Sequence, residues 1–298
     1  MRLGPAVQII SFALILLLSG ASGAISADGA RAQFLGSYVW KMHKPWFGGW
    51  SGIDLSADGQ HMTVISDRSH ILKGQISREG DKITAIRPGP VFPIQASTGK
   101  NLTGRAGDSE GLAVSPNGHI YISFEGVARV AEYTKPNSRA VALPRPDAFR
   151  KFGKNRALEA LAVDDKGRLY AVPEMTDDKG EIPVFVFKDN AWSPGFSLAG
   201  GGGYLPVGVD FGPDGRIYLL ERSWNIFGFR ARLRRWTLVN GQPQKEELLV
   251  QTRTGTHDNL EGVSIWRDQQ GRTRVTMISD DNFLFLQRTE LVEYAITE

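Results

Sequence analysis

Acidic residues recur along this chain at the starts and ends of short apolar runs. Carboxylates that are brought together repel one another, which raises their pKa values unless a cation lies between them. The chain contains no Cys, so oxygen atoms are the main candidate ligands, and oxygen-only sites favour Ca²⁺ or Mg²⁺. The residues that we predict to hold such a cation are Glu110, Glu159, Glu261, Asp280 and Asp281.

A repeated pattern explains why these acids should meet. Five segments each contain a short apolar strand closed by a turn, and Asp-Gly or Asn-Gly turns are a strong hairpin signal. A second apolar strand follows every turn, and further β-like runs follow that strand. The five segments are 51–59, 110–118, 159–167, 207–215 and 261–271.

The repeat length predicts an all-β fold, a single β-propeller of four-stranded blades. Four strands in roughly 50 residues is the blade of such a propeller, and no segment has a sustained 3.6-residue apolar period. We count five blades; six remain an alternative only if another blade lies within 87–108. We expect the N-terminal strand, 35–42, to pair with the C-terminal strand, 291–297, and so to close the ring.

The propeller places the acids at one mouth of its channel. The first two strands of a blade are antiparallel, so the start of the first and the end of the second lie at the same face. Second-strand ends carry Asp67, Glu125, Glu174, Glu221 and the pair Asp280 and Asp281. The functional interpretation is a divalent cation site, with Ca²⁺ preferred and Mg²⁺ as a second option. The alternative is that arginines pair with these acids and hold the loops.

Three further residues are candidates for catalysis near this mouth. Arg68 and Arg222 could bind phosphate oxygens, and His257 could protonate a leaving group. Gly107–Gly111 matches the G-x-S-x-G pattern, but the strand that follows is not the strand–turn–helix context that this nucleophile motif needs. Arg230, Arg232 and Arg234 alternate along one strand and form either an anion-binding face or an exposed outer face.

The N-terminal sequence is typical of a secretory signal peptide. Residues 1–24 combine a positive start, an apolar stretch at 7–18 and small residues before the cleavage position; a second cleavage position lies as late as residue 32. The apolar stretch is shorter than the roughly 20 residues of a membrane span. We therefore expect a mature domain, 33–298, that is periplasmic or secreted, with no stable membrane anchor after cleavage.

The net charge limits the partners. A formal charge of +3 is too small and too dispersed to indicate nucleic-acid binding. We expect a monomer that acts on a small-molecule substrate, in particular a phosphorylated one.

In order and spacing, several motifs resemble the phytase-like family of secreted bacterial proteins, which is described as having the esterase-like activity of phytase. The resemblance covers about residues 34–298. It implies a β-propeller hydrolase that cleaves phosphate or carboxyl esters. The motifs that carry it are 51–54, 66–68, 108–112, 158–161, 173–174, 221–222, 258–262, 278–283 and 287–289.

Together these observations predict a metal-dependent ester hydrolase, with phosphomonoesterase activity as the leading hypothesis. Two alternatives stay open. A gluconolactonase-type lactonase would hold one cation with carboxylates and with Asn259 and Asn282. A non-catalytic propeller would bind a ligand or partner without turnover, because a fold does not imply a function.

Overall fold

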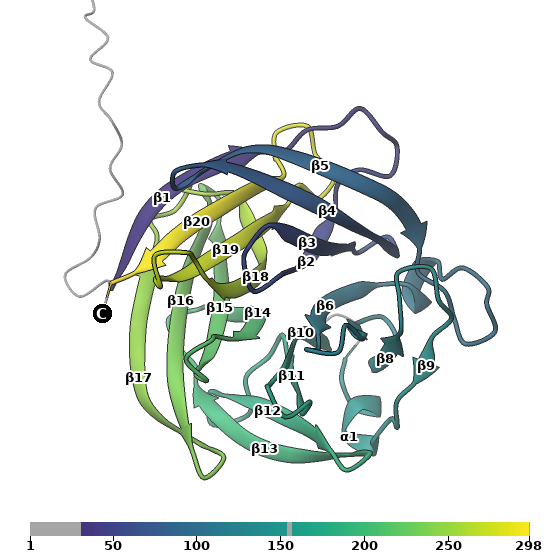
Figure 1. The fold of residues 1–298 in the computed structure, drawn as a ribbon. Coiled ribbons are helices and arrows are strands. Elements are labelled where there is room, and N and C mark those ends of the chain that lie inside the picture. The colour runs from purple at the N-terminus through teal and green to yellow at the C-terminus, as the bar shows by residue number, and fades with distance from the viewer. Residues whose placement is uncertain (1–30, 154–156, 298) are drawn as a thin grey trace, which may run out of the picture.

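The computed structural model describes residues 31–153 and 157–297, and in this part of the chain the fold is an all-β propeller (Figure 1). Five four-stranded antiparallel sheets form its blades. Blade 1 contains β2 (Trp50–Leu55), β3 (His61–Ser66), β4 (His70–Glu79) and β5 (Lys82–Pro93). Blade 2 contains β6 (Ser109–Val114), β7 (Ile120–Phe124), β8 (Arg129–Tyr133) and β9 (Val141–Ala142).

The other three blades follow in chain order, again from the innermost strand outward. Blade 3 contains β10 (Leu158–Val163), β11 (Leu169–Pro173), β12 (Glu181–Lys188) and β13 (Ala191–Ala199). Blade 4 contains β14 (Leu205–Phe211), β15 (Ile217–Asn225), β16 (Gly228–Val239) and β17 (Gln242–Gln251). Blade 5 contains β18 (Asn259–Arg267), β19 (Thr273–Asp280), β20 (Glu290–Ile296) and β1 (Ala32–Val39).

Pairing of the two terminal strands closes the ring, as predicted. β1 runs antiparallel to β20, from Ala32 opposite Ile296 to Val39 opposite Glu290. The N-terminal strand begins and ends three residues earlier than expected. Residues 87–108 contain no sixth blade: β5 continues to Pro93, and a 3-10 turn, η1 (Gly104–Ala106), precedes β6. The prediction of five blades is confirmed.

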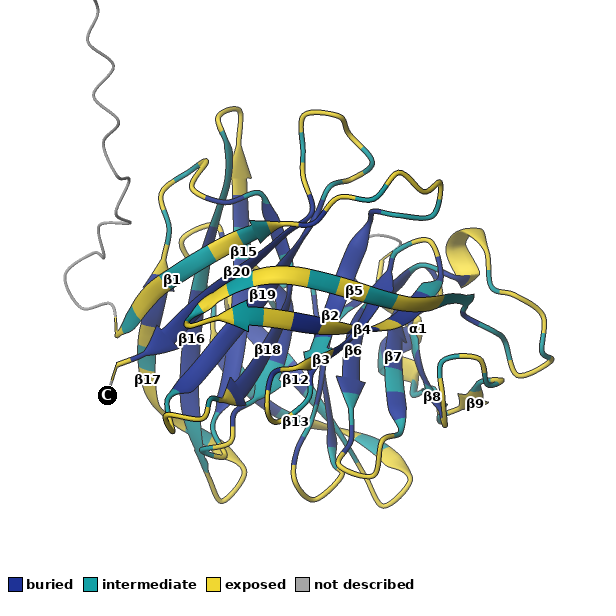
Figure 2. Ribbon diagram, turned by 45° about the horizontal axis from the view of Figure 1, so that its top comes forward, coloured by how far each residue is buried: buried dark blue, intermediate teal, exposed yellow. Residues whose placement is uncertain are grey.

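The core lies between the blades, because each sheet buries both faces against its neighbours. Five clusters of buried apolar side chains fill the five spaces between adjacent blades. Between blades 1 and 2, for example, Ile65 and Ile71 pack with Ile122 and Phe124. Figure 2 shows buried inner strands, whereas β5, β13 and the hairpin tips carry exposed residues.

The predicted hairpin turns form between the first and second strands. The glycine that ends each turn has a positive φ, for example +84° at Gly118 and +72° at Gly215. Such a φ is strained for residues with a side chain, which explains the preference for glycine there. These turns lie at the face opposite the candidate site, because the first strand runs away from the mouth.

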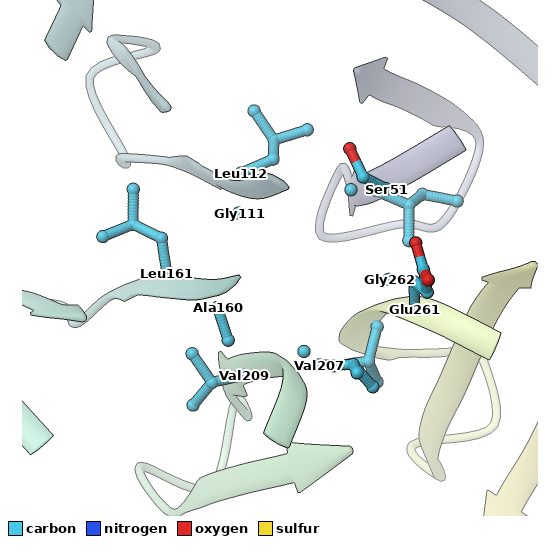
Figure 3. A pocket seen from close by; sticks show the side chains of 13 residues that line it. Ser51, Gly111, Leu112, Ala160, Leu161, Val207, Val209, Glu261 and Gly262 are labelled. Carbon is cyan, nitrogen blue, oxygen red and sulfur yellow. The ribbon is translucent and has the colours of Figure 1, made fainter. Parts of the chain in front are cut away.

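The channel at the centre of the ring is closely packed. Figure 3 shows residues from all five innermost strands around it, mostly small or apolar ones such as Ala160, Val209 and Gly262. A Cβ atom on Gly111 would lie 2.6 Å from Leu161 N, and one on Gly208 would lie 2.7 Å from Glu261 O. Glycines thus allow neighbouring blades to approach closely, and the channel presents its polar groups at the mouth.

Replacing Gly111 by valine is expected to lower the free energy of unfolding by about 1–3 kcal/mol, because the added side chain overpacks this contact. Urea denaturation measures the effect. Gly153→Ala is the control, since a Cβ at Gly153 meets no atom of the described part of the chain within 4 Å. If Gly111→Val is as stable as the control, close packing of the inner strands does not limit the fold.

The predicted signal peptide, residues 1–24, lies outside the described residues. Among the residues that are described, no helix has the length and apolar character needed to cross a membrane.

Candidate functional site

The first set of candidate ligands lies on β-bulges at the mouth of the channel. Every innermost strand has one residue more than its partner strand at the equivalent place. A bulge redirects a side chain, and bulges are frequent beside active sites. The extra residues, in blade order, are Ser51, Glu110, Glu159, Val207 and Glu261. Three of the five predicted metal ligands therefore occupy equivalent positions around one ring.

The second set lies at the mouth end of the second strand of each blade, directly after β3, β7 and β11 in blades 1 to 3 and within β15 and β19 in blades 4 and 5. The same backbone bond recurs there: Asp67 N, Glu125 N and Glu174 N each donate over 2.9 Å to a carbonyl of the loop that enters the blade. In every blade, the residue before the bulge of the first strand pairs with a residue of the second strand, and the next residue after that partner is the member of the second set. This pairing identifies equivalent residues in the five blades. The equivalent residues, in blade order, are Asp67, Glu125, Glu174, Arg222 and Asp280.

Glu221, which we predicted at the mouth, does not belong to this second set. In blade 4 the residue before the bulge, Pro206, pairs with Glu221, so Arg222 takes the equivalent position. A register change of one residue moves a side chain to the other face of the sheet. The buried carboxylate of Glu221 instead accepts hydrogen bonds from Arg232 (2.7 and 2.8 Å) and Arg234 (2.7 and 2.8 Å).

Two overlapping groups of carboxylates form where blades 2 and 3 meet. One oxygen each of Asp108, Glu110 and Glu125 lie within 4.8 Å of one another, and so do oxygens of Glu125, Glu159 and Glu174. Glu125 belongs to both triads. Their donor set consists only of carboxylate oxygens, which fits Ca²⁺ or Mg²⁺. These two triads are the candidate metal centre.

Two predicted ligands, Glu110 and Glu159, belong to the triads, whereas three triad members were not among the predicted ligands. Glu125 and Glu174 had a usable signal, because each directly follows a second strand. Asp108 precedes β6 and is positioned by the loop that enters blade 2. The sequence does not show which of the acids around the ring approach within one ion's reach.

In blade 4 neither set contributes a carboxylate, and Arg222 instead contacts acids of the two neighbouring blades. Its guanidinium lies 3.0 Å from Glu174 Oε1 in blade 3, donates over 2.5 Å to Asn259 Oδ1 and pairs closely with Glu261 in blade 5. Asn259 Nδ2 also donates to Glu261 Oε1 over 2.8 Å. The salt-bridge interpretation therefore describes Glu261 and Glu174, while Glu110 and Glu159 have no ion pair among the described residues.

Asp281 has a loop-holding role in the structure. Its Oδ1 accepts hydrogen bonds from Gly49 N (3.0 Å) and Phe283 N (3.1 Å), and its Oδ2 accepts one from Thr289 Oγ1 (3.1 Å). These three donors fix the loop before β20 against blade 1. Asp281 is not a member of either triad.

Asp280 and Asp67 extend the acidic ring beside Glu261. Burial, reinforced by Glu261, raises the pKa of Asp280 to about 8. Burial also raises the pKa of Asp67 to about 7, although Arg68 opposes the shift. The Oδ1 atom of Asp67 is buried and has no hydrogen-bond partner among the described residues. An unpartnered carboxylate oxygen beside further acids is consistent with a site for a cation.

Carboxylates of both triads have raised pKa values, as expected of acids that are gathered to hold a cation. Burial first, and then Glu159 and Glu261, raises the pKa of Glu110 well above its usual value. Burial and then Glu174 and Glu261 do the same for Glu159. Burial and then Asp108 raises the pKa of Glu125 to about 7. A bound cation would favour the charged forms and remove this repulsion.

His257 lies away from these carboxylates. Its Nε2 is 3.0 Å from Tyr294 Oη, its Nδ1 is 3.9 Å from Glu290, and its ring packs against Phe34 with centroids 5.8 Å apart. Burial lowers its pKa, which favours the neutral ring. The contacts of His257 are thus with side chains of blade 5.

Arg68 lies at the rim, directly after Asp67. Its exposed guanidinium stacks on the ring of Phe283, 3.1 Å from the centroid. Among the described residues it has no ion-pair partner within 4.0 Å. It can therefore offer hydrogen-bond donors to an anion near the mouth.

Two other sequence motifs have structural roles. Ser109 is fully buried, and its Oγ donates to Ser66 O over 2.6 Å, so it is not presented as a nucleophile. Arg232 and Arg234 bind Glu221, and Arg230 stacks on Tyr204 at 4.8 Å. This strand is therefore neither an exposed face nor a free anion site.

Arg222→Gln is expected to destabilise the cation-free protein by about 3–5 kcal/mol, because it leaves buried carboxylates uncompensated. Urea denaturation in EDTA measures this loss, and saturating Ca²⁺ should recover part of it. Arg139→Gln, an exposed change in blade 2, is the control and should stay within about 0.5 kcal/mol of the wild type. Equal stability of the two variants would show that Arg222 does not balance the ring.

Fold and site together define a five-bladed β-propeller with a carboxylate-lined mouth. The chain belongs to the phytase-like family, because the family model described as "Esterase-like activity of phytase" matches residues 45–283. The matched range contains every residue of both triads. Among curated proteins, none matches the chain.

Several solved structures are similar in fold to this chain. An α-L-arabinofuranosidase from Podospora anserina, in complex with cellotriose, has a TM-score of 0.52 and 12% identity, over 91% of this chain and 99% of that one. A gluconolactonase from Xanthomonas campestris has a TM-score of 0.45 and 15% identity, over 82% and 72%. The PQQ-bound aldose sugar dehydrogenase from Streptomyces coelicolor has a TM-score of 0.46 and 13% identity, over 87% of this chain and 98% of that one. At these identities the likeness concerns the fold alone.

Proposed function

We propose that this protein is a metal-dependent ester hydrolase that acts as a phosphomonoesterase at the carboxylate-lined mouth. The observation that carries the proposal is that Glu125 belongs to both triads. One carboxylate shared by two ligand sets is what two neighbouring cations require, and paired cations are common in enzymes of phosphate chemistry. Membership of the phytase-like family supports the same class of reaction.

The residues of the site would have three separate roles: metal binding, positioning of the acids and binding of the substrate. The five triad residues would hold Ca²⁺, or Mg²⁺ as the second option. Bound there, the cations would supply Lewis-acid neutralisation of phosphate oxygens and a bound water of lowered pKa. Arg222 keeps Glu174 and Glu261 in place, and Arg68 would bind a phosphate oxygen from the rim. We assign no role to His257, because its contacts lie elsewhere.

The proposal is tested by assays of the purified protein after treatment with EDTA. Ca²⁺, Mg²⁺, Mn²⁺ or Zn²⁺ is added back, with p-nitrophenyl phosphate, p-nitrophenyl acetate and glucono-1,5-lactone as substrates. Cation-dependent release of phosphate is the expected result. Turnover of the lactone alone would establish the lactonase alternative instead. Calorimetric binding of a cation without turnover of any substrate would establish a binding protein.

We further propose that the protein acts outside the cytoplasm as a monomer. The location outside the cytoplasm rests on the predicted signal peptide, residues 1–24. Mass spectrometry of the protein from cell fractions tests it, with the mature N-terminus expected between residues 25 and 33. Light scattering should give the mass of one chain, and an intact N-terminus in the cytoplasmic fraction would contradict export.

A further inference from the structure

Two loop tips at the mouth face present apolar side chains to solvent. The first tip is the turn between β15 and β16, and the second is the connection from β19 to β20. Both follow strands that run toward the mouth, because Arg222 and Asp280 lie at the mouth ends of these strands. The six most exposed large apolar side chains of the described residues all lie on these tips: Trp224, Ile226, Phe227, Leu284, Phe285 and Leu286.

Neither turn chemistry nor core packing explains the residues of the first tip. Asn225 pairs with Gly228, which leaves Ile226 and Phe227 as the two central residues of the turn. Asn, Asp and Gly are the usual residues of two-residue hairpin turns, yet Ile226 here is 89% exposed. Asn225 Oδ1 accepts a hydrogen bond from Phe227 N over 2.8 Å. The turn is therefore a fixed support for two apolar side chains that pack against no core.

A strained backbone precedes the second tip. Asn282 and Phe283 have φ angles of +46° and +54°, which are costly for a residue as bulky as phenylalanine. Asp280 Oδ1 accepts a hydrogen bond from Asn282 N (2.7 Å), and Asp281 Oδ1 accepts one from Phe283 N (3.1 Å). These bonds hold the strained conformation, and the apolar residues that follow it are kept out of the core, with Phe285 94% exposed.

The two tips belong to one surface, because a single segment holds both of them. This segment, 252–258, connects blade 4 to blade 5. Gly255 N donates to Phe229 O at the base of the first tip over 2.8 Å. Asp258 Oδ2 accepts a hydrogen bond from Arg288 N at the end of the second tip over 2.9 Å. We call residues 224–227 and 284–286 together the apolar rim.

The chain around the apolar rim is basic. The stretches 224–230, 252–257 and 282–288 contain no Asp or Glu. The triads lie between blades 2 and 3, whereas the apolar rim lies on blades 4 and 5. Apolar loop ends beside arginines complement the two layers of an anionic bilayer surface, its acyl chains and its negative headgroups. The arginines of the three stretches are Arg230, Arg253 and Arg288.

We propose that the apolar rim docks the protein reversibly on an anionic membrane surface, with the mouth of the propeller facing the bilayer. A membrane is favoured over a protein partner because the apolar side chains lie on two narrow loop ends. A fluid acyl layer accepts such ends without matching pockets, whereas a stable protein interface buries roughly 800 Å² on each partner with closely complementary packing. Docking adds a partner to the proposed function and needs no turnover.

Docking is tested by co-sedimentation of the purified protein with vesicles made of equal amounts of phosphatidylcholine and phosphatidylglycerol. EDTA is present, so that no cation can bridge the triads to lipid phosphate. Phe285→Ser and Ile226→Ser, one on each tip, are each expected to weaken binding about ten-fold or more, because a buried apolar side chain is lost. Val239→Ser, at an exposed turn of the opposite face, is the control and should stay within about two-fold of the wild type.

The role of charge is tested with a second kind of vesicle, made of phosphatidylcholine alone. The wild type should bind these neutral vesicles more weakly. Arg253→Gln is expected to weaken binding to the mixed vesicles about five-fold and to leave binding to the neutral ones within about two-fold. Arg139→Gln, an exposed change in blade 2, is the control. Equally tight binding of the wild type to both kinds of vesicle would contradict an anionic partner.

Fluorescence shows whether the apolar rim enters the acyl layer. Phosphatidylcholine with brominated acyl chains quenches a tryptophan that reaches that layer, and Trp224 is the exposed tryptophan of the first tip. Quenching should be seen in the wild type and mostly lost in Trp224→Phe. This variant should still bind the vesicles within about two-fold, since phenylalanine is also apolar. Unchanged quenching in Trp224→Phe would contradict insertion of this tip.

Three further results would overturn the inference. They are no binding of the wild type to mixed vesicles, equal losses in Phe285→Ser and Val239→Ser, or a dimer in light scattering that Phe285→Ser dissociates, which would assign the apolar rim to a second copy of the chain. Thermal midpoints identify a misfolded variant, and the variant of the other tip then replaces it. Vesicle binding is measured without substrate, so its failure is distinct from failure of the ester hydrolase proposal.

Discussion

Glu125→Gln is expected to lower kcat/KM for phosphate esters by at least about 100-fold and to weaken Ca²⁺ binding in parallel. Even residues that only support a metal ligand are worth roughly 10–100-fold in affinity or activity, and Glu125 contributes to two triads at once. Glutamine keeps the size of the side chain but removes its charge. Isothermal titration with Ca²⁺ and initial-rate kinetics over a range of Ca²⁺ concentrations measure the two effects.

The control for this experiment is Glu132→Gln. Glu132 lies in the next strand of the same blade, but it pairs with His119 near the turn face and not with the triads. Its replacement should leave both Ca²⁺ affinity and kcat/KM within about two-fold of the wild type. If Glu125→Gln binds Ca²⁺ as tightly as the control, the triads are not the metal centre.

The cation-free protein is expected to lose stability as the pH rises from 5 to 8, with a fall in the melting temperature of roughly 5–10 °C. The pKa values of Asp67 and Glu125 are raised to about 7, and that of Asp280 to about 8. The folded state therefore binds more protons than the unfolded state, so stability falls as the pH rises. The contribution is complete below pH of about 4 and is lost as the pH passes through 7 to 8.

Ca²⁺ should reverse this dependence. A cation present at 100 times its dissociation constant adds about 2.7 kcal/mol of stability, and the gain should be larger at pH 8 than at pH 5, because ligands must be deprotonated to bind. Scanning calorimetry in EDTA and in Ca²⁺ at several pH values measures both effects. Asp280→Asn should flatten the pH slope in EDTA, whereas Glu132→Gln should keep it. A melting temperature that rises with pH in EDTA would contradict the assignment of strained carboxylates.

Much of the fold could be predicted, because a propeller repeats its local signals. Each turn glycine and the apolar strands on either side recur at similar spacing, and so the number of blades follows from counting. The closing strand was placed three residues late, at 35–42 in place of Ala32–Val39. Strand ends depend on the partner strand, and β20 lies more than 250 residues away along the chain.

The site was predicted less completely, because a single residue of register decides which side chain faces the mouth. Glu221 and Arg222 are adjacent, and only the pairing of Pro206 with Glu221 shows that Arg222 points to the ring. Asp280 and Asp281 differ in the same way: one extends the acidic ring, and the other holds a loop. His257 precedes a strand of the mouth but packs against Phe34 and Tyr294.

The sequence by itself determined the class of fold, the face on which the acids gather and the oxygen chemistry of any metal site. These properties depend on local patterns, on strand direction and on composition. Only the tertiary structure decided that the triads form between blades 2 and 3 and that Arg222 compensates Glu261 and Glu174. The reason is physical: Coulomb interactions and coordination depend on distances of a few ångströms between residues from different blades. Those distances are set by bulges, register and the packing of one blade against the next.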